Sequence, residues 1–152
     1  MKTMTGILLA LALATPALAH DDATLDAMPS PHGGQIRMAG PYHFELVLGD
    51  NEVSLYLTDH ADAPVPSEGV GGNVILMSGE RVTIAVAPTG DNRLAGQGAF
   101  EKRPDMKAIT SLTFPDGNTW QARFTPGTHV GAEHSSAVDP ATDGDDHANH
   151  HH

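Results

Sequence analysis

The chain has 152 residues, a formal net charge of −11 at pH 7, ten histidines and no cysteine. A charge so negative argues against nucleic acid and anionic lipid surfaces as partners, because their phosphates would be repelled. The lack of cysteine excludes disulfide bonds and thiolate ligands, which leaves histidine, methionine, aspartate and glutamate to hold a cation.

Residues 1–19 have the pattern of a cleaved export signal. Lys2 supplies a positive start, residues 6–14 are apolar, and Ala17-Leu18-Ala19 matches a cleavage site. No later segment has the roughly 20 apolar residues that a membrane-spanning helix needs. We therefore expect a periplasmic protein whose mature chain begins at His20 and is not inserted in a membrane.

Beyond a segment expected to be flexible, residues 20–30, short alternating apolar runs are separated by glycine, proline and aspartate. Residues 42–48 and 53–57 flank Gly49-Asp50-Asn51 and are predicted to pair as a hairpin. Further strands are expected at 73–77, 81–87, 94–100, 107–114 and 119–124. The pattern predicts an all-β fold, a small immunoglobulin-like antiparallel β-sandwich over residues 31–127.

Residues 128–152 are predicted to form a disordered tail rich in histidine and aspartate, because they contain too few apolar side chains to offset the entropy of ordering. The tail would offer a weak, flexible metal site made of His147, His150, His151 and His152. Asn149 interrupts this run, which favours a native tail over an expression tag.

Histidines and acidic residues also gather around the first hairpin. His43 and Glu45 are two residues apart on one strand, so they project from the same face. His32 precedes a Gly-Gly turn that can bring its ring back toward the sheet, and strand pairing places Asp59 and His60 near His43. The sequence therefore predicts a core metal site at His32, His43 and His60, with Glu45 or Asp59 as additional ligands.

Imidazoles with a carboxylate suit Zn²⁺ or Cu²⁺, whereas the thioether of Met38 or Met77 would favour Cu⁺. Spacing alone does not choose between copper and zinc. Both methionines also fit as core filler, as do Met106 and Trp120. Equally, His43 and Glu45 could form an ordinary exposed strand face, and His32 could simply form a hydrogen bond within a turn.

The motifs P-H-G-G-Q (31–35), G-x-Y-H-x-E-L (40–46) and V-x-L-Y-L-T-D (53–59) resemble a small periplasmic heavy-metal-binding β-domain. That domain occurs in heavy-metal efflux systems, either fused to adaptor subunits or free-standing. The resemblance covers roughly residues 29–125 and implies cation binding beside an exporter, with an efflux adaptor or transporter as partner. Because the chain lacks the helical-hairpin and barrel segments of a full adaptor, a carrier, buffer or accessory role is expected.

Two other functions fit the sequence. The first is a metal-independent interaction module that docks on a periplasmic transport complex through an exposed sheet edge. The second is a histidine-brace copper protein, in which the amine and ring of His20 chelate copper with His43 or His60. The sequence contains no nucleophile elbow, phosphate loop, dinucleotide fingerprint or H-E-x-x-H motif, so an enzyme is not expected. Metal affinity should fall below about pH 6, because protons compete for imidazole ligands.

Overall fold

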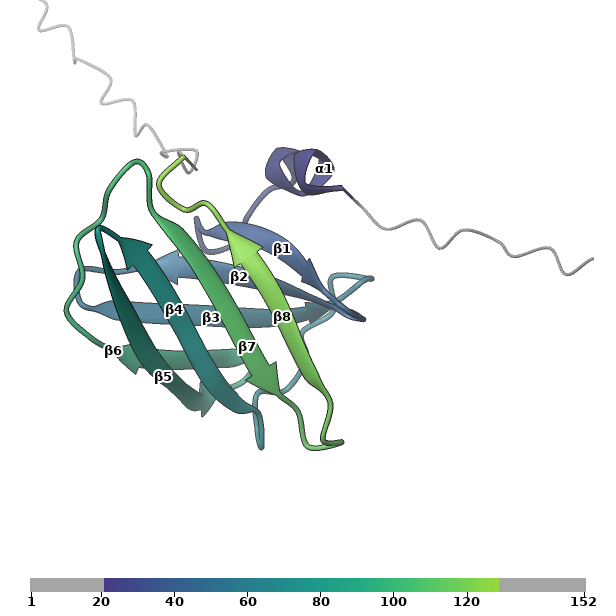
Figure 1. The fold of residues 1–152 in the computed structure, drawn as a ribbon. Coiled ribbons are helices and arrows are strands. Elements are labelled where there is room, and N and C mark those ends of the chain that lie inside the picture. Colours follow the sequence, from purple (N-terminus) through teal and green to yellow (C-terminus); the bar gives the residue numbers. More distant parts are fainter. Residues whose placement is uncertain (1–20, 129–152) are drawn as a thin grey trace, which may run out of the picture.

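The computed structural model describes residues 21–128, which form one short helix and eight strands (Figure 1). The elements are α1 (Asp22–Ala27), β1 (Gln35–Ala39), β2 (Tyr42–Leu48), β3 (Glu52–Asp59), β4 (Gly71–Ser78), β5 (Glu80–Gly90), β6 (Arg93–Gln97), β7 (Lys107–Thr113) and β8 (Thr119–Phe124). Every strand pair is antiparallel, in the order β1-β2-β3-β6-β5-β4-β7-β8. The predicted all-β antiparallel fold is confirmed, and within residues 21–128 no helix could cross a membrane.

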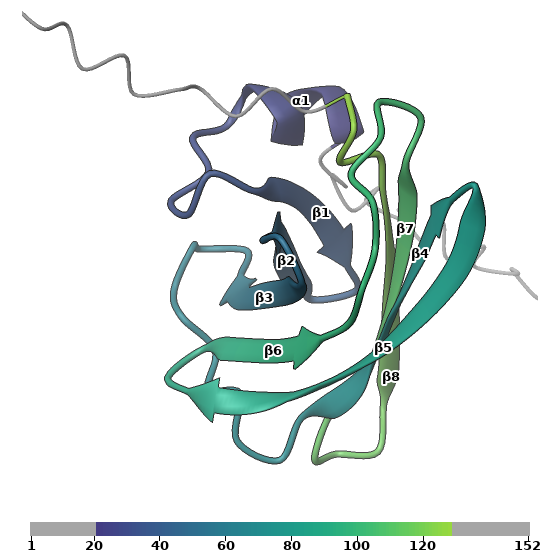
Figure 2. The ribbon, with the colours of Figure 1, turned by 90° about the vertical axis from the view of Figure 1, so that its left-hand side faces the viewer.

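The strands form two layers because β5 belongs to both of them (Figure 2). The first part of β5 pairs with β4, from Ser78 opposite Glu80 to Gly72 opposite Val86. Its last part pairs with β6 and contains an irregularity between Pro88 and Gly90. One layer therefore contains β1, β2, β3 and β6, and the other contains β4, β7 and β8.

The helix α1 covers the seam where β1 and β8 lie side by side (Figure 2). Gln35 of β1 bridges this seam, since its Oε1 accepts a hydrogen bond from the Thr125 N–H at 2.8 Å. The buried Arg37 donates to Asp26 of α1 at 2.8 Å, and the side chain of Leu25 in α1 is buried. The segment predicted to be flexible thus contains a helix.

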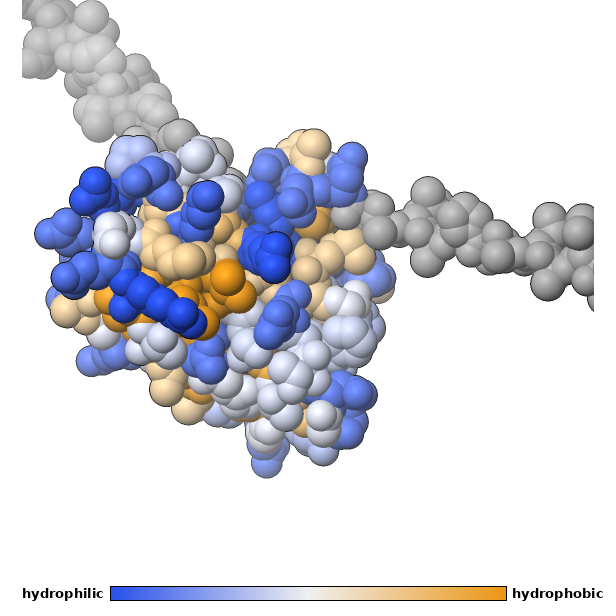
Figure 3. Space-filling view, in the orientation of Figure 1, coloured by the Kyte–Doolittle hydropathy of each residue, from blue (hydrophilic) through white to orange (hydrophobic). Residues whose placement is uncertain are grey.

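The core lies between the layers and is built from alternate residues of the strands. The predicted inward faces are confirmed, since Phe44, Leu46, Val53, Leu55 and Leu57 are all buried there. Met106 is buried as well, and Trp120 packs against the core, as expected. On the outside of the second layer, one apolar patch lies among hydrophilic side chains over β4 and β7 (Figure 3).

Candidate metal centre

The predicted site residues of β2 lie on the outer face of the first layer. Strand register places Met38, His43 and Thr58 in one row, and Ile36, Glu45 and Tyr56 in the next. We call these six residues the histidine face.

The histidine face is covered rather than exposed. A pocket of about 260 Å³ lies between it and the segments before β1 and after β3, and is lined by residues including Met28, Pro31, His32 and Asp62. Only 2 % of His43 and 5 % of Glu45 are accessible to solvent, although both side chains point away from the core. The alternative of an ordinary exposed strand face is therefore wrong.

Glu45 is tied to the segment that precedes β1. Its Oε1 accepts hydrogen bonds from the backbone N–H of His32 at 2.9 Å and of Gly34 at 3.0 Å. Its Oε2 lies 2.8 Å from Nδ1 of His32, whose ring stacks on Tyr56 with centroids 3.5 Å apart. Metal binding at this carboxylate would have to break these contacts, so Glu45 anchors the segment before β1 and is not an open ligand.

A second cluster surrounds His43, at the next row of the histidine face. Nδ1 of His43 lies 3.6 Å from Oδ1 of Asp62, and its ring centroid is 5.0 Å from that of His60. Both partners are exposed residues of the loop after β3. Nε2 of His60 lies 3.2 Å from the carbonyl oxygen of Gly40. The hairpin register predicted from the sequence therefore does bring His60 to His43.

Asp59 has a different role from the predicted one. It pairs with Tyr42 in the ladder, as expected, but its Oδ1 accepts the N–H groups of Ala61 at 2.8 Å and Ala63 at 3.0 Å. This carboxylate shapes the loop, and Asp62 is the acidic residue that reaches His43. Asp62 was not among the predicted ligands, although its position two residues after His60 was a usable signal.

Two imidazoles and a carboxylate form a donor set that suits Zn²⁺ or Cu²⁺. A metal bound to a ring nitrogen lies roughly 3.2 Å from the ring centre, so two rings on one ion can be separated by up to roughly 6.4 Å. The 5.0 Å between His43 and His60 falls within this range, but the two rings are stacked with planes 25° apart, so their nitrogens do not point at one ion in this arrangement. Among residues 21–128, however, no three histidine or acidic side chains already converge as a metal site. His60 and Asp62 would have to turn toward a shared point.

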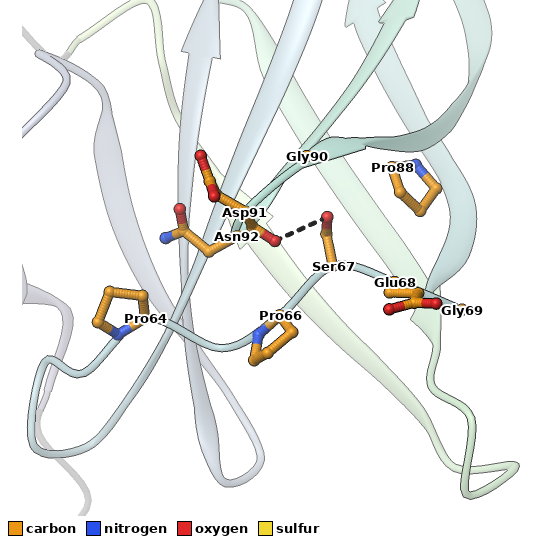
Figure 4. Close-up of a pocket in the computed structure, with 9 residues that line it drawn as sticks. All are labelled: Pro64, Pro66, Ser67, Glu68, Gly69, Pro88, Gly90, Asp91 and Asn92. Atoms are coloured by element: carbon orange, nitrogen blue, oxygen red, sulfur yellow. Dashed lines mark hydrogen bonds between the residues drawn. The ribbon is translucent and has the colours of Figure 1, made fainter.

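Another pocket, of about 640 Å³, lies at the loop between β3 and β4 and the turn between β5 and β6 (Figure 4). Three prolines and a few small or acidic residues line it, with no histidine among them: Pro64, Pro66, Ser67, Glu68, Gly69, Pro88, Gly90, Asp91 and Asn92. Ser67 Oγ donates to the carbonyl oxygen of Asp91 at 3.0 Å across its wall. None of the predicted ligands within residues 21–128 lines this pocket.

Of the other predicted metal-binding positions, the two methionines lie in the described part of the chain and the rest lie outside it. Met38 lies directly opposite His43, whereas Met77 belongs to the other layer. The export signal, His20 with its brace, and the tail histidines 147, 150, 151 and 152 lie outside the described residues.

Comparison with known proteins found no match to this chain among family models, curated proteins or solved structures. The resemblance to heavy-metal efflux domains therefore stays a prediction.

Proposed function

We propose that the chain is a periplasmic transition-metal-binding protein that carries or buffers copper or zinc beside an efflux or homeostasis system. One observation supports this proposal above the others. His43 is nearly inaccessible on the outer face of a sheet, 3.6 Å from a carboxylate and 5.0 Å from a second imidazole. The proposed ligands are His43, His60 and Asp62.

The three proposed ligands differ in the structure that supports them, which indicates how a cation would be taken up. His43 is held on β2, while His60 and Asp62 belong to one short loop whose shape depends on Asp59. A cation would reach His43 as the loop side chains turn inward, and ligand imidazoles would release any bound protons. The negative charge of the whole chain would raise the local concentration of cations.

The test is a titration of the full chain with Zn²⁺ and Cu²⁺ by calorimetry, and with Cu⁺ by competition against a chromophoric chelator. One-to-one binding should weaken at least tenfold in His60→Ala and in Asp62→Asn, where each change removes one ligand. Asn tolerates the positive φ of 60° found at position 62, so the loop should keep its shape.

Two controls locate the site. His32→Ala removes a histidine of the same region that lies outside the proposed set and should leave affinity unchanged, provided that its melting temperature confirms folding. Replacing His147, His150, His151 and His152 by alanine removes the tail site. Full affinity in His60→Ala, or loss of binding in the tail variant, would show that the proposed site is wrong.

A further inference from the structure

The outer face of the second layer carries a cluster of positive charge. Strand register puts Arg81, Met77 and Lys107 side by side across β5, β4 and β7. The next row contains Ile75, Ile109 and Arg123, the last on β8. We call these six residues the basic face.

The charge of this face is opposite to that of the chain. The whole sequence has 19 acidic and 8 basic residues, yet the one acidic residue of these four strands is Glu80, at the exposed start of β5 and out of register with the basic face. Asp22 of α1 lines a pocket at its edge together with Lys107 and Arg123. Arg81, Lys107 and Arg123 are exposed, and they surround three apolar side chains that are only partly buried. The space-filling view shows an apolar patch over β4 and β7, the strands that carry these side chains (Figure 3). An apolar centre with a basic rim fits an acidic segment that also carries apolar residues.

The described chain ends beside this face. After β8 it turns at residues 125–128, where Gly127 packs so closely on the backbone of Arg103 and Pro104 that a Cβ would overlap it. Lys107 begins β7 three residues after Pro104, and Arg123 lies near the end of β8. The described residues therefore end, at Thr128, at the same end of the sheet as the basic rim.

We propose that residues 129–152 of the same chain cover the basic face. This segment contains Glu133, Asp139, Asp143, Asp145 and Asp146, has no lysine or arginine, and carries Val130 and Val138. The ten residues that follow Thr128, up to Val138, can span at most roughly 33–36 Å. The four strands of the face extend over only about 14 Å. A second copy fits less well, because its basic face would bring the same positive charges.

Because residues 129–152 are joined to the basic face by the chain itself, weak contacts are enough to keep them on it. A segment joined to its binding face by a short linker has an effective concentration in the millimolar range, so even millimolar intrinsic affinity gives substantial occupancy. The contacts are largely electrostatic, and salt should therefore release them.

The test uses the absence of cysteine, which allows one nitroxide label to be attached to the full chain through Ala141→Cys. At low salt, the label should broaden the backbone amide signals of Ile75, Ile109 and Arg123 in an NMR spectrum. The broadening should disappear in 1 M salt, where the screening length is about 3 Å. Arg123→Glu should abolish it at low salt as well.

Lys102→Glu is the matched control, because it makes the same change of charge on an exposed loop residue outside the basic face. It should leave the broadening intact. Absence of broadening on the basic face, or equal broadening in Arg123→Glu, would overturn the proposal. Broadening that passes from labelled chains to separate isotope-enriched chains would also overturn it, in favour of contact between copies. None of these outcomes depends on metal binding.

Discussion

Gly40 shows how one residue can decide the fit of two distant segments. It forms the two-residue turn between β1 and β2 with a φ of 60°, and a Cβ at this position would overlap the ring of Trp120. Glycine is thus required both by the backbone conformation and by the close approach of the indole.

Gly40→Ala should therefore destabilise the protein in two ways. Overpacking against the indole should cost about 1–3 kcal/mol. The left-handed backbone conformation should cost about 1–2 kcal/mol more. Urea unfolding measures the sum, and Gly117→Ala is the control, since Gly117 has a φ of 84° but no neighbour within 4 Å of an added Cβ. Equal losses of unfolding free energy in the two variants would mean that the Trp120 ring moves aside without a cost in stability.

Asp116 makes the turn between β7 and β8 sensitive to acid. Hydrogen bonds from the backbone N–H and side chain of Asn118 lower the pKa of Asp116 below its ordinary value of 3.8. Because the folded pKa lies below the unfolded one, these bonds stabilise the fold above the unfolded value. Their contribution is lost as pH falls through the folded pKa.

Asn118→Ala removes the side-chain bond and keeps the backbone one. The pKa of Asp116 should rise toward 3.8 in this variant, which an NMR titration of the carboxyl signal would detect. An unchanged titration curve would show that the backbone bond alone determines the shift.

At the scale of elements, the attachment of α1 depends on a buried cation. Arg37 lies beneath the helix and pairs with Asp26 at 2.8 Å, while its contact with the more exposed Asp22 is 3.5 Å. Asp26→Ala should cost about 1–3 kcal/mol, because a buried charge loses a hydrogen-bonding partner. Asp22→Ala should cost about 0.2–1 kcal/mol. Chemical denaturation of both variants checks the difference, and a smaller loss in Asp26→Ala than in Asp22→Ala would contradict it.

The elements that could be predicted were those with a clear alternating pattern. The hairpin of β2 and β3 has its expected register, with Tyr42 opposite Asp59. α1 was missed because its six residues are too few to show a helical period, although Asp21 caps it through the N–H of Thr24. β1 was missed because its core-side positions opposite Leu46 and Phe44 are the polar Gln35 and Arg37, which hide the apolar alternation.

The candidate site could be predicted only in part, for a different reason. Period-two alternation correctly put His43 and Glu45 on one face, but their burial comes from segments before β1 and after β3. The choice between Asp59 and Asp62 depends on hydrogen bonds within a loop, which no periodicity encodes.

At the scale of the whole molecule, the two proposed binding surfaces belong to different layers. The histidine face lies outside β1, β2 and β3, and the basic face lies outside β4, β5, β7 and β8. The core separates them, so a ligand on one surface does not block the other. Metal titration and the spin-label experiment therefore test independent properties.

The position of β5 links these two surfaces mechanically. The first part of this eleven-residue strand pairs with β4 and the last part pairs with β6. Each layer therefore depends on β5 for some of its backbone hydrogen bonds. Separation of the layers would have to break hydrogen bonds along one continuous backbone, whereas the seam between β1 and β8 is bridged by side chains such as Gln35. If the two layers separate, they should therefore part first at the seam between β1 and β8, beneath α1, and pivot about β5.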